Sequence, residues 1–207
     1  MDTDETTGHG SGFVGATPII GNQVRLRPID TADYGALYWM EQDPAISPRF
    51  RQRTASVRPE HYGDVLWHNV VCAFAVDSIA DGSLIGMVSV TDADGANGHA
   101  RMGMIVRPDL VDETWPLEMA ELLLDHVFSV FPFRKVYAEV VATAIDQYRR
   151  ANVFFEVEGR LVEHLWCEGQ WEDVVILAVH RSAWLKRSES GTAPAAPSPT
   201  NDDLGNG

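Results

Sequence analysis

The stretch Arg107–Ala142 constrains the fold of this chain more than any other, because it joins a long apolar helix to a buried strand. Between Trp115 and Phe131 polar residues recur every three or four positions, which predicts an amphipathic helix that ends before Pro132. The polar residues of this stripe are Glu118, Glu121, Asp125 and Ser129. Residues Lys135–Ala142 are apolar on nearly both faces, which is typical of a strand in a sheet covered on both sides. The helix N-terminus therefore lies at a sheet edge, where its free N–H groups can bind an anion.

The charge balance of the chain restricts its partners. Of 207 residues, 16 are Lys or Arg and 30 are Asp or Glu, so the formal net charge is −14. Nucleic acids and anionic membranes both require a basic face, and we therefore expect neither as a partner. No apolar run approaches the roughly 20 residues of a membrane span. Residues 1–12 are polar and acidic, unlike a signal peptide, so we expect a cytoplasmic protein.

The two cysteines give no sign of a metal centre. Cys72 and Cys167 are far apart in the sequence and lack the spacing of metal ligands. Both fall in strand-like segments, so we expect buried free thiols and predict no metal site.

The chain reads as one domain, residues 18–187, between two polar tails. Residues 1–17 and 188–207 are poor in apolar side chains, and we expect both to be disordered. Apolar runs predict strands at Val24–Pro28, Val70–Asp77, Leu84–Thr91, His99–Val106, Lys135–Ala142, Gly159–Trp166 and Trp171–His180. Shorter helices are predicted at Thr31–Glu41 after the capping residue Asp30, at Pro59–Trp67 and at Asp146–Asn152. The fold class is α+β, a mixed and twisted sheet of about seven strands with helices on both faces.

Arginines gather in the segment between Ala45 and Val57, which is unusual in so acidic a chain. Arg49, Arg51 and Arg53 alternate with other residues there. One interpretation is a solvated loop. The other is a cationic rim that binds an anionic group of a substrate.

This order of elements resembles the GNAT N-acyltransferase family. The segment VRLRPIDTADYGALYWMEQDP is similar to the first strand and helix of that family, and RKVYAEV is similar to its fifth strand. The final hairpin, EVEGRLVEHLWCEGQWEDVVILAVHRSAW, resembles the branch that acetylates ribosomal-protein N-termini and small-molecule amines. The resemblance covers about Gln23 to Trp184.

The resemblance implies transfer of an acyl group, usually acetyl, from coenzyme A to a small-molecule amine or a peptide N-terminus. The family holds the pyrophosphate of the cofactor on a glycine-containing loop, whereas Asp112 and Thr114 stand at the matching positions here and no glycine remains. The residues that the resemblance places at the cofactor are Ile105, Val106, Arg107, Val111, Asp112, Glu113, Thr114, Trp115, Thr143, Arg149 and Arg150.

Three residues are candidates for proton transfer. Tyr148 follows the fifth strand of the family and can protonate the leaving thiolate. Glu139 lies on a central strand and must face something polar if it is ionised. His99 begins the fourth strand of the family and can relay a proton. On that strand Arg101 replaces a glutamate that often acts as the base, so we assign it, with Arg49, Arg51 and Arg53, to substrate binding.

Two hypotheses remain open from the sequence. The first is an N-acyltransferase in which the amine attacks the thioester directly, without a covalent enzyme intermediate. The second is a GNAT-like module that binds a ligand or partner, or carries out other chemistry, without acetyl-CoA. The scaffold favours the first hypothesis and the loop without glycine favours the second. The resemblance leaves both a monomer and a homodimer open.

Overall fold

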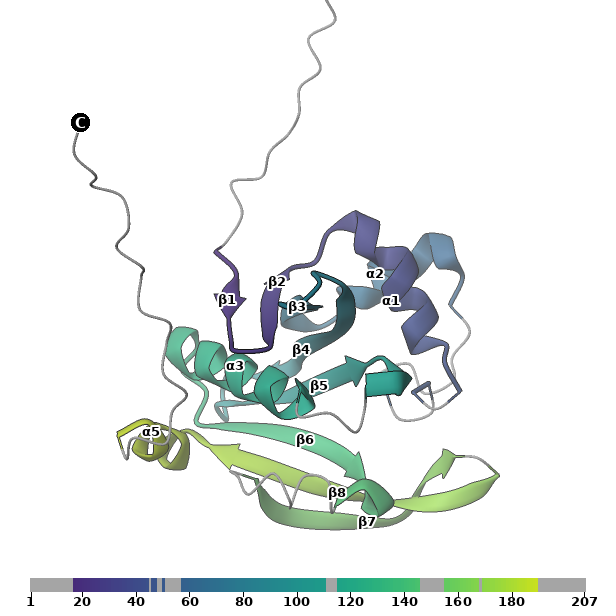
Figure 1. The fold of residues 1–207 in the computed structure, drawn as a ribbon. Coiled ribbons are helices and arrows are strands. Elements are labelled where there is room, and N and C mark those ends of the chain that lie inside the picture. Colours follow the sequence, from purple (N-terminus) through teal and green to yellow (C-terminus); the bar gives the residue numbers. More distant parts are fainter. Residues whose placement is uncertain are drawn as a thin grey trace, which may run out of the picture.

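The computed structural model describes residues 17–44, 46–47, 50, 57–110, 115–145, 155–167 and 169–189. Within these residues, eight strands form one sheet in the order β1-β2-β3-β4-β5-β6-β8-β7. All neighbours are antiparallel except β5 and β6, which are parallel (Figure 1). The strands are β1 Ile19–Ile20, β2 Val24–Pro28, β3 Val70–Ser78, β4 Leu84–Asp94, β5 His99–Val106, β6 Lys135–Val141, β7 Glu156–Cys167 and β8 Gln170–His180.

Helices cover both faces of the sheet. The described helices are η1 Thr31–Asp33, α1 Tyr34–Glu41, η2 Pro59–His61, α2 Tyr62–Leu66, η3 Pro108–Leu110, α3 Trp115–Val130, η4 Ala142–Ala144 and α5 Arg181–Glu189. The predicted α+β sheet is confirmed, with eight strands instead of about seven because the two-residue β1 pairs with β2. The helix predicted at 146–152 lies outside the described residues, as do residues 1–16 and 190–207 of the predicted tails.

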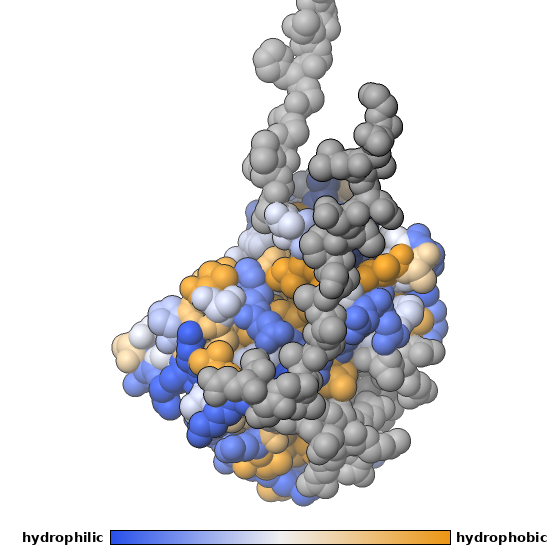
Figure 2. Space-filling view, turned by 60° about the vertical axis from the view of Figure 1, so that its left-hand side comes forward, coloured by the Kyte–Doolittle hydropathy of each residue, from blue (hydrophilic) through white to orange (hydrophobic). Residues whose placement is uncertain are grey.

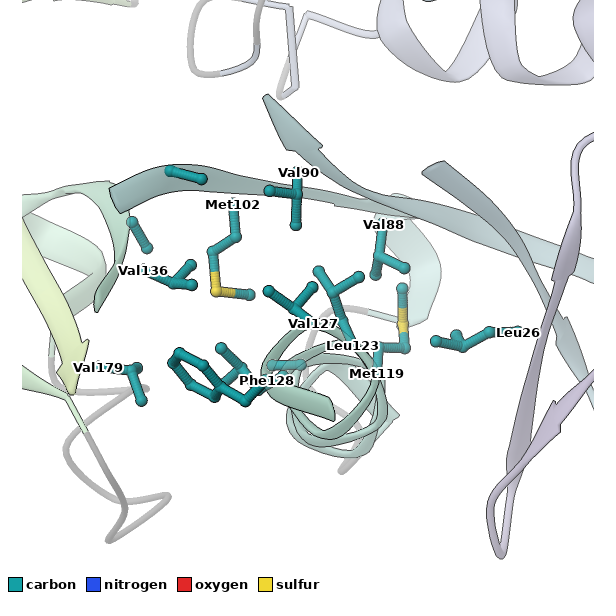
Figure 3. Close-up of a cluster of buried hydrophobic side chains, with 14 of the residues drawn as sticks. Leu26, Val88, Val90, Met102, Met119, Leu123, Val127, Phe128, Val136 and Val179 are labelled. Carbon is teal, nitrogen blue, oxygen red and sulfur yellow. The ribbon is translucent and has the colours of Figure 1, made fainter. Parts of the chain in front are cut away.

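The larger core lies between α3 and one face of the sheet. Met119, Leu123, Val127 and Phe128 of α3 are buried against strands β2 to β6 and β8. Their side chains point at the sheet in Figure 3. A second cluster joins α1 and α2 to the opposite face through the buried Met87 of β4 and residues of β5. Both faces are thus covered near β4 and β5, as the apolar strands predict.

The polar stripe of α3 meets both ends of the described chain. The Glu118 carboxylate is buried and accepts hydrogen bonds from the backbone N–H groups of Asn22 and Gln23 at the β1–β2 turn. Asp125 accepts a 2.7 Å hydrogen bond from Nε1 of Trp184. The stripe therefore binds the β1–β2 turn and α5 at these two residues.

Helix α5 is absent from the predicted elements, although it completes the core. Its Trp184 is 1% exposed and contacts the ring of Phe128 with centroids 6.3 Å apart. The residues around Trp184 in α5 are mostly polar, so the sequence shows no apolar stripe with helical spacing. The helix therefore depends on tertiary packing. Cys167 is buried as expected, whereas Cys72 is half-buried, and burial raises the pKa of the Cys72 thiol to about 11.

Candidate active site

The sheet opens where β5 and β6 separate. These strands pair only at His99–Lys135, Ala100–Val136 and Arg101–Tyr137. Residues 102–106 and 138–141, all described, form no further ladder pairs with each other. Beyond Arg101, β5 stays paired with β4, while β6 stays paired with β8, so the two strands diverge (Figure 1). A cavity of about 670 Å³ lies at this divergence and is lined by residues of both strands. The diverging edges of β5 and β6 therefore border this cavity.

The cavity has an apolar half on the side of α3. Successive side chains of a strand point to opposite faces, so β5 and β6 each contribute alternate residues to each half. The apolar lining belongs to the core under α3 or packs against it. Its residues are Met102, Met104, Ala120, Ala138, Val140 and Phe155.

The half on the side of α2 is polar. Arg101 and Gly103 of β5 and Glu139 of β6 line it, together with Asp64 and His68 from the region of α2. A Cβ atom on Gly103 would lie 3.3 Å from Cε2 of Phe50, tighter than ordinary contact. Glycine at this position therefore lets the Phe50 ring lie close to the strand.

Arg101 and Glu139 form an ion pair beside the point where the strands separate. Nη2 of Arg101 lies 3.1 Å from Oε1 of Glu139, and their side chains are 47% and 20% exposed. Two residues to which the sequence assigned separate roles are therefore in contact. The prediction that an ionised Glu139 faces a polar group agrees with this geometry.

Sequence reasoning missed several polar residues of the cavity. Asp64, His68, Asn69 and Asp92 all line it. Asn69 and Asp92 adopt the left-handed conformation, with φ of 53° and 51°, which these two residue types tolerate better than most. The Asp92 N–H donates a 3.1 Å hydrogen bond to the Asn69 carbonyl, which fixes the start of β3 against β4. Neither residue was a candidate from the sequence, because the register that brings them together is not visible there.

The cavity carries more negative than positive charge. Its described lining residues include the carboxylates of Asp64, Asp92 and Glu139 but one guanidinium, that of Arg101. Because the openings of such cavities focus the field of their charges, this half attracts cations.

The other described candidates lie at the edges of the cavity or away from it. His99 is not among the described lining residues, and its ring packs edge-on against Tyr137 with centroids 5.5 Å apart. Ile105 and Val106 are buried at the end of β5. Arg107 pairs with Asp109 at 2.8 Å, which raises the pKa of Arg107 above its usual value.

Two further candidates flank α3 and β6. Trp115 begins α3, and its Nε1 donates a 2.7 Å hydrogen bond to Oε1 of Gln23. Thr143 lies in η4, directly after β6. The remaining candidates lie outside the described residues: Arg49, Arg51, Arg53, Val111, Asp112, Glu113, Thr114, Tyr148, Arg149 and Arg150.

Solved structures with the same fold support this architecture. A crystal structure of spermidine N-acetyltransferase from Vibrio cholerae in complex with CoA and spermine superposes with a TM-score of 0.68 at 22% identity, covering 79% of this chain and 98% of that one. An acetyltransferase of the GNAT family from Bacillus anthracis gives a TM-score of 0.65 at 16% identity, covering 80% of this chain and 99% of the other.

Sequence comparison identifies the family. A curated relative, the spermidine N(1)-acetyltransferase of Vibrio cholerae, is 26% identical over 133 residues, which are 63% of this chain and 75% of the relative. The family model for the acetyltransferase (GNAT) domain matches residues 23–145, more than half of the chain. This match confirms the predicted enzyme class, an N-acetyltransferase that uses an acyl-CoA, and the chain belongs to the acetyltransferase (GNAT) domain family.

Proposed function

We propose that this N-acetyltransferase acts on a small polycationic amine of the spermidine type. The observation that carries the proposal is the acidic half of the cavity, where Asp64, Asp92 and Glu139 face the space between the separated strands. An ammonium group gains from several nearby carboxylates, and an acceptor with more than one ammonium can contact more than one of them. The spermidine acetyltransferase among the relatives supports the same class of acceptor.

The opposite half suits the acyl donor. The diverging edges of β5 and β6 can hydrogen-bond the amides of the coenzyme A arm, while Met102, Ala138 and Val140 provide apolar contact. The donor phosphates would then lie toward the start of α3, near Arg107, Trp115 and Thr143. We keep the predicted residues 111–114, Arg149 and Arg150 as part of this proposed donor site.

The chemistry follows from placing amine and thioester in one cavity. The amine nitrogen attacks the thioester carbonyl carbon, the carbon–sulfur bond breaks, and coenzyme A leaves as its thiol. Most of the rate gain comes from orienting the two reactants. In this proposal Glu139 contacts the ammonium of the acceptor, and the guanidinium of Arg101 beside it offsets part of the charge of that carboxylate. Tyr148 keeps its predicted role of protonating the leaving thiolate.

A thiol-release assay tests the proposal. Acetyl-CoA should be consumed with spermidine or spermine, and much more slowly with a monoamine of similar length or with a peptide bearing a free N-terminus, the other predicted acceptor. Asp64→Asn and Asp92→Asn should raise the KM for spermidine with little effect on the KM for acetyl-CoA. Glu60→Gln, an exposed carboxylate on η2 outside the described cavity lining, is the matched control and should leave both unchanged.

Two results would contradict the proposal. If the enzyme acetylates the peptide faster than spermidine, its acceptors are protein N-termini and not polycationic amines. Absence of acetyl-CoA binding, measured by calorimetry, would favour the GNAT-like module that works without this donor.

A further inference from the structure

An acceptor amine in this cavity has to lose a proton before it can react. Amines of the spermidine type are ammonium ions near neutral pH, and an ammonium nitrogen has no free electron pair for attack. The surrounding carboxylates stabilise the charged form further. The site that attracts the acceptor therefore also makes its deprotonation harder, so a proton acceptor is needed close to the amine.

Side-chain chemistry separates the candidates for this role. The described residues that line the cavity offer three carboxylates, one guanidinium and the imidazole of His68. Carboxylic acids ordinarily titrate near pH 4, and a guanidinium stays charged. Imidazole is the side chain whose ordinary pKa lies closest to neutral, which is the value a general base requires. We infer that His68 takes the proton from the acceptor ammonium, a role that rests on the proposed function.

The backbone around His68 is well anchored. Its N–H donates a 3.2 Å hydrogen bond to the Val65 carbonyl at the end of α2. The next residue, Asn69, accepts the hydrogen bond from Asp92 that ties this junction to β4. His68 is also exposed, so a proton taken from the acceptor can pass on to solvent.

The charged groups that share the cavity with His68 come from four elements or their flanks. Asp64 lies on α2, Asp92 on β4, Arg101 on β5 and Glu139 on β6. Arg101 and Glu139 pair with each other, so Asp64 and Asp92 carry the excess negative charge around this position.

The proposed step balances in charge and atoms. The ammonium transfers one proton to the imidazole, which leaves a neutral amine and an imidazolium. The amine nitrogen then bonds to the carbonyl carbon while the carbon–sulfur bond breaks. The departing sulfur takes a proton from the predicted acid, and the second proton of the nitrogen replaces it. The amide and the free thiol are the products, and the imidazolium releases its proton to water.

The test compares two exposed histidines. His68→Ala should lower kcat with acetyl-CoA and spermidine by about 100-fold, as loss of a general base typically does. It should also shift the rise of kcat/KM with pH to more alkaline values, and added imidazole should restore part of the rate. His164→Ala removes an exposed histidine of β7 that is absent from the described cavity lining, and should leave the rate and its pH dependence unchanged.

The outcomes separate the two proposals. A His68→Ala variant that keeps the native melting temperature, rate and pH profile would overturn the role of His68 alone. Loss of rate without a changed pH profile and without rescue by imidazole would also overturn it, since a purely structural role gives that pattern. Absence of turnover by the unmodified chain with every amine would overturn the proposed function itself.

Discussion

At the scale of single residues, the pair Arg101–Glu139 affects how strongly the cavity binds a cation. Glu139→Gln leaves the guanidinium without this carboxylate and should raise the KM for spermidine by about 10-fold, equivalent to about 1.4 kcal/mol. Arg101→Met removes the positive charge beside this carboxylate and should lower the same KM several-fold, because a unit charge about 4 Å away contributes about 1 kcal/mol even in water. Steady-state kinetics with varied spermidine measures both effects.

Asp109→Asn is the control for that experiment. It disrupts the Arg107–Asp109 pair, whose residues are not among the described cavity lining, and should leave the KM for spermidine unchanged. A rise in KM with both Glu139→Gln and Arg101→Met would show that the pair acts through its geometry, and would contradict a purely electrostatic role.

Asp112 and Thr114, at the two positions where the family has glycine, lead to a second prediction at this scale. Carboxylates beside the expected pyrophosphate repel it, so we expect acetyl-CoA to bind with a Kd of roughly 100 μM or weaker, about −5.5 kcal/mol. Asp112→Gly combined with Thr114→Gly should tighten binding in calorimetry. Affinity for acetyl-pantetheine, which lacks the pyrophosphate, should not change. Low-micromolar binding of acetyl-CoA by the unmodified chain would refute this expectation.

At the scale of elements, a charged cluster joins β6, β7 and β8 at the start of β6. The Lys135 ammonium is 2.8 Å from Oε2 of Glu158 on β7, and Nε2 of His180 on β8 is 3.1 Å from Oε1 of the same carboxylate. The hydrogen bond that Lys135 donates to Glu158 lowers the pKa of Glu158 and raises the pKa of Lys135. The cluster therefore stabilises the fold between the ordinary titration ranges of the two side chains, roughly pH 5 to 10.

Glu158→Gln should reduce the free energy of unfolding at pH 7 by about 1 kcal/mol, a value discounted because the Glu158 side chain is partly exposed. The difference from the unmodified protein should shrink as the pH falls below about 4, because protonation then removes the native carboxylate charge as well. Urea unfolding of both proteins at pH 7 and below about pH 4 measures this difference in the free energy of unfolding. Glu163→Gln, on the exposed part of β7, is the control, and an equal loss at both pH values would contradict the electrostatic account.

The elements also show what the sequence can and cannot predict. Apolar periodicity located β2, β5 and α3 within one residue at each end, because burial on a defined face leaves a regular pattern. It missed α5, whose position depends on one buried tryptophan, and it began β7 three residues late, at Gly159. The two bulges of β7 shift its register against β8, which obscures the alternation.

The cavity was harder to predict than the elements. Glu139 and Arg101 were identified through their strand and through the family resemblance. Asp64, His68 and Asp92 were not, because Asp64 and His68 come from the region of α2 and Asp92 from β4. These two parts of the chain meet only through the registers of β3, β4 and β5. A sequence pattern records the periodicity of each element, whereas a site of this kind depends on how the elements are assembled.

At the scale of the whole molecule, surface and charge set how ligands approach. Hydrophobic residues form separate patches among hydrophilic ones on the face shown in Figure 2. None of the described helices is long and apolar enough to cross a membrane. The net charge of −14 gives the protein a long-range field that attracts a polycationic acceptor and repels a polyanionic donor.

This field predicts opposite salt dependences for the two substrates. Raising the NaCl concentration from about 10 to about 100 mM shortens the screening length from roughly 30 to roughly 10 Å. The KM for spermidine should then rise about 3-fold or more, because attraction is screened, while the Kd of acetyl-CoA should fall or stay constant, because repulsion is screened. Acetyl-pantetheine carries no phosphate groups and should bind equally well at both concentrations. Weaker binding of acetyl-CoA at the higher salt concentration would contradict this prediction. It would mean that attraction of the cofactor phosphates by local basic groups, such as Arg149 and Arg150, exceeds their repulsion by the net charge of the protein.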